Sequence, residues 1–229
     1  MDELAALHAS GLFGDARAAD LEVLRPALRS RVFPQGAHLW HAGDPTGLAM
    51  VVDSGLVKVC HIGRGGRELI VSLVGPHESG GAYHLFATDS RRMYDAIAVQ
   101  RSECLVIARD LLMYQLEQRP ALMRRLADAL LRKMMAETGA AMETPAAGDI
   151  PGRLRHRLLD LARRYGEPME RGVRIPFALP QTLLAGLVGG SREKVNRALA
   201  QLSAGGLVVR DAESRLTITD PARLRRDLS

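Results

Sequence analysis

Four polar residues follow a glycine-rich turn in the last third of the chain: Arg192, Glu193, Asn196 and Arg197. On a helix that begins after Ser191, they would lie within about one and a half turns of its N-terminus. Arginine can donate two hydrogen bonds to guanine O6 and N7, and glutamate can accept one from cytosine N4. A helix N-terminus also favours phosphate. These residues could therefore recognise base edges and backbone phosphates of a duplex.

The surrounding residues predict the two helices that would position this face. Gly189 and Gly190 permit a tight turn, and Ser191 is a suitable N-cap for the second helix. Apolar residues recur at helical spacing before and after the turn: Leu184, Leu187 and Val188, then Val195, Leu199 and Leu202. Two such helices joined by a short glycine turn form the helix-turn-helix pattern. A solvated helix face could hold the same polar types, but the turn, cap and periodicity agree with one another.

Two short apolar runs after the second helix predict a β-hairpin wing. Residues 207–209 and 216–219 would be its strands, and residues 210–214 its turn. Arg210 and Arg215 are candidate phosphate contacts, and the alternative is that they are simply solvated.

Charge is distributed unevenly along the chain. Residues 1–149 contain 16 Lys and Arg against 18 Asp and Glu, whereas residues 150–229 contain 15 against 8. Composition favouring arginine explains why 28 of the 31 cations are Arg, but not this asymmetry. A basic final third predicts a module that binds a polyanion.

The first half of the chain predicts an antiparallel β-sandwich or jelly roll. Glycine, proline and aspartate turns separate short apolar or alternating runs at residues 48–52, 56–62, 69–74, 96–99 and 104–107. Helical spacing precedes this region at residues 4–28 and returns at residues 111–117.

A long helix is expected from Pro120 to about residue 142. Its apolar stripe predicts the seam of a dimer, and packing on its own barrel is the alternative. The stripe consists of Met123, Leu126, Leu130 and Met134. Thr144 and Pro145 open a break in the pattern, so we expect an α+β protein with a sensor domain at 1–118, a dimerisation helix and hinge at 119–148, and a DNA-binding domain at 149–229.

Several motifs resemble the cyclic-AMP receptor protein/fumarate-nitrate regulator (Crp/Fnr) family. The segment Ser191-Arg192-Glu193-x-Val195-x-Arg197-x-Leu199, the wing and the closing residues 218–221 are similar to its DNA-binding domain. Residues 52–59 are similar to the glycine-punctuated core of its cyclic-nucleotide-binding jelly roll. The resemblance covers nearly the whole chain, and it implies a homodimer that binds a palindromic DNA site and contacts RNA polymerase.

The resemblance assigns roles in DNA binding residue by residue. Arg192, Glu193 and Arg197 match the three base-reading positions of the cyclic-AMP receptor branch, which implies a TGTGA-like half-site. Gln181 matches a phosphate-contacting position, while Lys194 and Asn196 are less usual and would alter flanking preference. With Ser191, these residues make up the predicted DNA-binding set.

The effector pocket matches less well. Gly81 and Arg92 match the family's phosphate-binding cassette, and Thr138 aligns with a threonine that contacts adenine. Ala82 stands where the family has a glutamate that holds a ribose hydroxyl, and Met93 stands where it has a hydroxyl donor. The resemblance therefore implies a small effector whose identity is unknown, and the two departures predict that it is not cyclic AMP.

The same domain contains cysteines and histidines, which are candidate ligands of a metal or of haem. Cys60 and Cys104 are too few for a four-cysteine iron–sulfur cluster or a zinc site, so no metal site is predicted. Candidate haem ligands are His61, His77 and His84. His38 and His41, three residues apart, are expected on opposite faces of a strand.

Composition and motifs exclude several other classes. The apolar runs are far too short to span a bilayer, and the acidic start is unlike a secretory signal, so a cytoplasmic protein without a membrane partner is expected. The sequence has no nucleophile elbow, HExxH motif, phosphate loop or kinase signature, so no enzyme is expected. The alternatives are a haem-sensing, redox-sensing or effector-independent regulator, or a nucleotide-binding module that does not bind DNA.

Overall fold

A computed structural model describes residues 2–14, 16–63, 66, 68–87, 90–143 and 149–226, without the side chains of 140–143. The chain divides into two compact units, residues 1–61 with 71–139 and residues 62–70 with 140–229. The division falls inside a long helix. Residues 144–148 lie outside the described part.

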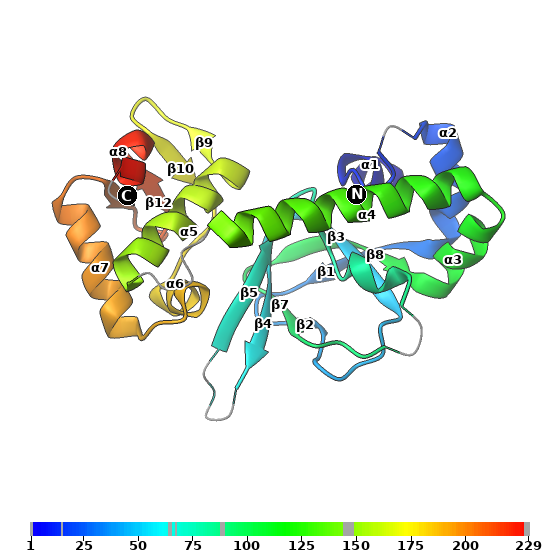
Figure 1. Cartoon of the computed structure of the whole chain (residues 1–229), viewed down its shortest axis with the longest axis horizontal. Helices are drawn as coiled ribbons and strands as arrows, with labels where there is room; N and C mark the ends of the chain where they lie inside the picture. The colour runs from blue at the N-terminus through cyan, green and yellow to red at the C-terminus, as the bar shows by residue number, and fades with distance from the viewer. Residues whose placement is uncertain are drawn as a thin grey trace. The chain divides into compact units, whose positions relative to one another are not determined.

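Two four-stranded sheets form the N-terminal sandwich (Figure 1). The first has the order β1 (Leu28–Phe33), β8 (Ser102–Ala108), β3 (Leu48–Ser54) and β6 (Ser79–Gly80). The second has the order β2 (His38–Trp40), β7 (Asp95–Ala98), β4 (Val57–Ile62) and β5 (Glu68–Val74). The pairings described between these strands are antiparallel, which confirms the predicted jelly-roll class.

Strand β3 is buried on both faces. Met50 and Val52 point into the core between the two sheets, together with Trp40 of β2. Ala49 and Val51 point the other way, into a core that helices cover. Successive side chains of β3 point to opposite faces and enter two different cores, which explains why the strand has a continuous apolar run.

The second of these cores is closed by helical segments from both ends of the sandwich. They are α1 (Glu3–Ala9), α2 (Ala18–Leu21), the 3₁₀ helix η1 (Glu22–Ala27) and α3 (Arg109–Glu117). The helical spacing over residues 4–28 corresponds to α1, α2 and η1, and Gly11 and Gly14, which adopt positive φ, separate α1 from α2. Residue 28 already belongs to strand β1.

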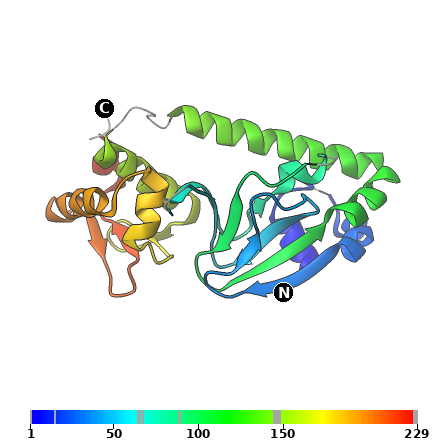
Figure 2. The same ribbon diagram turned by 90° about the horizontal axis from the view of Figure 1, so that it is seen from below.

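Helix α4 (Pro120–Glu143) has the predicted start and is 24 residues long. It runs beside the sandwich (Figure 2), and its residues Leu122, Leu126 and Leu130 join the helix-covered core.

The C-terminal unit is a winged helix-turn-helix. Helix α5 (Ile150–Tyr165) is capped by Asp149, whose carboxylate accepts a 2.8 Å hydrogen bond from the Gly152 amide. It packs against α6 (Gln181–Val188), α7 (Arg192–Ala204) and α8 (Pro221–Arg226). The four-stranded sheet of this unit has the order β11 (Val208–Arg210), β12 (Leu216–Ile218), β10 (Val173–Ile175) and β9 (Glu167–Pro168).

Among the described residues, no helix is both long enough and apolar enough to cross a bilayer.

Candidate nucleic-acid interface and effector site

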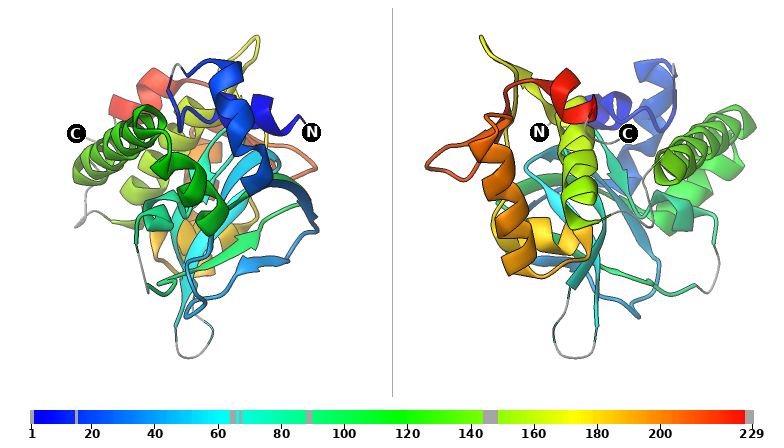
Figure 3. Two further views of the ribbon diagram at one scale, coloured as in Figure 1. Left: turned by 90° about the vertical axis from the view of Figure 1, so that its right-hand side faces the viewer. Right: turned by 60° about the vertical axis from the view of Figure 1, so that its left-hand side comes forward.

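Helix α7, drawn in orange in Figure 3, carries the predicted base-reading residues. Arg192, Glu193 and Arg197 are exposed, whereas Val195 and Leu199 are buried against the rest of the unit. The helix therefore presents cations and a carboxylate within two turns of its N-terminus, where a major groove accepts a helix.

The N-terminus of α7 is capped as the sequence predicts. The Ser191 hydroxyl accepts a hydrogen bond from the Lys194 amide at 3.4 Å. Hydrogen bonds from the backbone and from Ser191 lower the pKa of the Glu193 carboxyl. Glu193 is therefore ionised at neutral pH and able to accept a hydrogen bond from a base.

The turn between the two helices depends on both of its glycines. Gly189 ends α6 in the left-handed conformation, with φ of +62°. A Cβ on Gly190 would lie 2.7 Å from the side chain of Ile150, so this residue must be small for α5 to pack there. These contacts fix the approach of α6 to α7.

A hydrogen bond that the sequence did not predict joins the two helices. The Gln181 side-chain amide donates to the Asn196 side-chain oxygen at 2.6 Å. Gln181 therefore contacts α7 in the free chain, and its contact with phosphate stays a prediction. No local pattern could predict this pair, because the two residues are 15 positions apart.

The two wing arginines differ in their surroundings. Arg215 is held by Asp211 at 2.7 Å and by Glu213 at 2.9 Å. Arg210 is exposed at the end of β11. Arg210 is therefore the wing cation better placed to contact phosphate.

Arg92 is a buried cation of the N-terminal domain. Its side chain is 4% exposed, and its guanidinium lies 4.2 Å from the centre of the Trp40 ring. One nitrogen, Nη2, donates to the carbonyl of Leu48, but Nε and Nη1 are buried without a hydrogen-bond partner among the residues that the structure describes. Burial lowers the pKa of this guanidinium, and the nearby Asp44 only partly offsets the effect. Two unpaired donors on a buried cation indicate a site for an anion.

Gly81 lies directly against this guanidinium. A Cβ at this position would be 2.6 Å from Nη1 of Arg92, and the residue has φ of +70°. Gly81 therefore allows the backbone of the cassette to approach the arginine, and the structure brings these two predicted residues together. Ala82 is buried beside them, whereas the Met93 side chain is 67% exposed.

Residues 30–119 match the cyclic nucleotide-binding domain family, and residues 152–227 match the Crp-like helix-turn-helix domain family. Over 226 residues the chain is 30% identical to the CRP-like cAMP-activated global transcriptional regulator of Mycobacterium tuberculosis, covering 99% of each chain. The chain belongs to the Crp/Fnr family of transcription regulators.

Solved structures of Crp/Fnr regulators have the same fold. The global regulator CLP of Xanthomonas campestris, described as c-di-GMP responsive, is 25% identical with a TM-score of 0.69 and covers 89% of this chain and 100% of its own. FixK2 of Bradyrhizobium japonicum has a TM-score of 0.73 at 16% identity, covering 87% of this chain and 96% of its own.

The expected dimer seam of this Crp/Fnr regulator needs correction. Leu126 and Leu130 are 0% and 7% exposed in the core of their own domain, and Met123 is partly buried against that core. Of the predicted stripe, only Met134 is exposed, at 50%. Helical spacing alone could not separate the two outcomes, because α4 has apolar residues on two faces.

Thr138 is exposed near the C-terminal end of α4. The preceding residue, Glu137, accepts a 2.7 Å hydrogen bond from the Tyr83 hydroxyl of η2 (Ala82–Leu85), which follows Gly81. Burial, and then this bond, raise the pKa of Tyr83, so its hydroxyl stays a donor. Thr138 therefore lies one residue from a contact with the cassette, and its role toward an effector stays a prediction.

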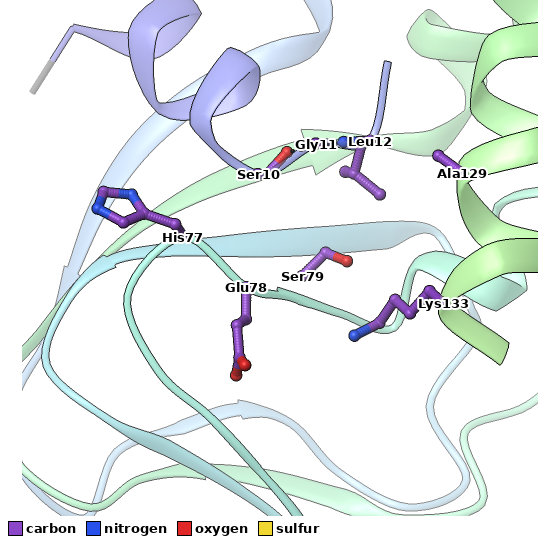
Figure 4. A pocket seen from close by; sticks show the side chains of 8 residues that line it. All are labelled: Ser10, Gly11, Leu12, His77, Glu78, Ser79, Ala129 and Lys133. Atoms are coloured by element: carbon purple, nitrogen blue, oxygen red, sulfur yellow. Dashed lines mark hydrogen bonds between the residues drawn. The ribbon is translucent and has the colours of Figure 1, made fainter. Parts of the chain in front are cut away.

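A small hollow lies elsewhere in the same domain (Figure 4). It has a volume of about 200 Å³ and is lined by residues 10–12 and 77–79, with Ala129 and Lys133 from α4. Because small-molecule pockets usually measure about 300–1,000 Å³, the hollow beside His77 is too small for haem.

The structure contradicts the expectation for His38 and His41. Their rings stack with centroids 4.0 Å apart and an interplanar angle of 21°. The pairing of β2 with β7 shifts register between His38 and Trp40, and this irregularity returns both histidines to one face. A β-bulge formed against a distant strand is not visible in strand periodicity.

Proposed function

We propose that this Crp/Fnr regulator acts as a homodimer on a palindromic site with TGTGA-like halves. The exposed Arg192, Glu193 and Arg197 at the capped N-terminus of α7 carry the proposal. Each side chain has a base edge that suits it, and two copies of the helix would read two half-sites one helical turn apart. RNA polymerase is the proposed protein partner of the bound dimer.

Base preference at single positions tests this proposal. Arg197→Ala is expected to lose about 1–3 kcal/mol per half-site and to relax the preference at one G·C pair. Binding would be measured to a panel of duplexes that differ by one base pair. Arg223→Ala on α8 removes the same charge away from α7, so it should leave base preference unchanged. Unaltered preference in the Arg197 variant would refute the assignment.

We further propose that the effector is a small anion held by Arg92, and that cyclic AMP binds weakly. The unpaired Nε and Nη1 of Arg92 support the anion, because a phosphate could accept from both. Ala82 and Met93 cannot supply the acceptor and hydroxyl donor that the family uses for a cyclic nucleotide. Losing the charged acceptor alone would weaken binding by about 10- to 150-fold. One relative is described as cAMP-activated and another as c-di-GMP responsive, so regulators of this fold differ in their ligands.

Calorimetric titration separates the possible effectors. Cyclic AMP, cyclic di-GMP and inorganic phosphate would each be titrated into the full chain and into Arg92→Gln. We expect binding of an anion that the Arg92 variant loses, with cyclic AMP weaker than micromolar. Micromolar or tighter binding of cyclic AMP that also raises operator affinity would refute this proposal.

The dimer seam is proposed on a different face of α4. Leu131, Met134 and Met135 are 52%, 50% and 65% exposed and recur at the three- and four-residue spacing of one helix face. A second copy of the chain would bury this apolar face.

A further inference from the structure

Three side chains of the sandwich converge at the start of β7. His38 lies on β2, His41 follows the end of that strand, and Asp95 is the first residue of β7. One ligand atom from each of the three lies within 4.8 Å of the others. Nothing in the proposed DNA or effector chemistry uses these residues.

The distances do not suit direct hydrogen bonds. Nδ1 of His38 is 3.6 Å from Oδ1 of Asp95, and Nδ1 of His41 is 3.5 Å from the same oxygen. Ordinary N–H···O bonds are about 2.7–3.2 Å long. Two ligands bound at about 2.1 Å around a tetrahedral ion are instead about 3.4 Å apart. The spacing of these atoms therefore fits a metal ion bound between them better than direct hydrogen bonds.

The donor set determines the class of ion. Two imidazoles with one carboxylate are typical ligands of zinc and of neighbouring divalent transition metals, whereas calcium and magnesium prefer oxygen alone. The Asp95 side chain is 12% exposed and the His41 side chain 61%, so a fourth position would be open to water.

Backbone contacts hold the ligands in place. The His41 amide donates to the Asp44 carboxylate at 2.8 Å, which fixes the turn after β2. The Ala42 amide donates to Asp95 Oδ1 at 3.4 Å. Both Nδ1 atoms lie beside the Asp95 carboxylate. A ring nitrogen donates its lone pair in the plane of the ring, so the exposed His41 ring would rotate out of the stack for both nitrogens to face one ion.

We propose that His38, His41 and Asp95 bind one divalent transition-metal ion per chain. The site also lies close to the anion-binding arginine. Trp40, between the two histidines, stacks on Arg92, and the Arg92 carbonyl accepts a 2.8 Å bond from the amide of Gly43. The proposal itself concerns metal binding and does not depend on the effector.

Titration with Co²⁺ alone tests the site, because cobalt(II) reports its ligands by visible absorption. The full chain, without affinity tag, should bind one equivalent. His41→Ala and Asp95→Asn should each weaken that binding at least tenfold. His61→Ala removes an exposed imidazole of the same domain and serves as the matched control. Zn²⁺ should displace the cobalt and abolish its absorption.

Circular dichroism and thermal unfolding establish that each variant is folded before titration. His41 is exposed, so its alanine variant should fold even if Asp95→Asn does not. The proposal is overturned if the folded native chain binds no Co²⁺ up to millimolar concentration, or if His41→Ala binds it as tightly as His61→Ala does.

Discussion

The surroundings of Cys104 bear on whether this regulator senses redox signals or binds a small effector. Its side chain is fully buried, and burial raises the pKa of the thiol to about 12, with Asp53 contributing in the same direction. Only the thiolate reacts readily with oxidants and disulfides. Cys104 is therefore a poor redox sensor in the folded domain.

Thiol labelling checks this conclusion. At pH 8 the native chain should leave Cys104 unlabelled by an aromatic disulfide reagent for the lifetime of the fold, whereas the chain in denaturant should react at once. Cys104→Ser would identify the reacting sulfur against Cys60. Fast labelling of Cys104 in the native protein would favour the redox-sensing alternative.

His84 reports on the charge of Arg92. Partial burial, and then the positive charge of Arg92, lower the pKa of this imidazole from its usual 6.5. The unfolded chain therefore takes up a proton at a higher pH than the fold does. His84 should reduce stability as the pH falls below about 6.5, and the loss should end once the folded imidazole is also protonated.

Proton NMR of the His84 ring would measure the effect. Arg92→Gln should raise the pKa of His84, because it removes the repelling charge. An anion bound at Arg92 should raise it in the native chain and leave it unchanged in the variant. If neither Arg92→Gln nor an added anion changes the pKa of His84, the imidazole is not coupled to the anion site.

How far the sequence predicts these sites depends on how local each one is. The residues of α7 could be placed because cap, turn and helix follow one another within about a dozen positions. The cluster around Asp95 could not, because it needs a bulge between β2 and β7. The link between Gln181 and Asn196 likewise depends on how two helices pack.

Helices and strands were likewise predicted where local sequence signals define them and missed where such signals are weak. Strands β3, β4, β5, β7 and β8 were predicted because turn residues bound their apolar runs. Strand β1 was missed because only its first residue, Leu28, is fully buried, and β2 because it is three residues long. The predicted N-terminal helical region consists of short helices, with Gly11 and Gly14 between α1 and α2 and with Pro26 inside η1.

Helix α4 allows its two apolar faces to be tested separately. Leu131→Glu, on the exposed face, should convert dimers to monomers with little change in thermal stability. Leu130→Glu, one residue away, would bury a charge in the domain's own core and should lose about 3 kcal/mol or more of stability. Sedimentation and thermal unfolding of both variants measure this. Dimers that persist in a folded Leu131→Glu variant would place the seam elsewhere.

For the whole molecule, binding to DNA should depend on salt in proportion to the phosphates contacted. The logarithm of the binding constant falls with the logarithm of salt concentration by about 0.9 per phosphate on duplex DNA. The excess of cations lies in residues 150–229, so this dependence should arise in the C-terminal domain. Arg210 is exposed there, while Arg215 is paired with Asp211 and Glu213.

A dimer contains each contact twice, so the change in slope reports both the contact and the assembly. Arg210→Ala should reduce the slope by about 1.8 in the native background, since two phosphates lose their partners. In the Leu131→Glu background the same substitution should reduce it by about 0.9, because a monomer has one wing. Arg215→Ala should change the slope less than Arg210→Ala in either background, since its charge is already neutralised by two acids. Operator affinity measured from about 50 to 200 mM salt gives all the slopes. Equal changes for Arg210→Ala in the two backgrounds would contradict binding as a dimer with two equivalent wings.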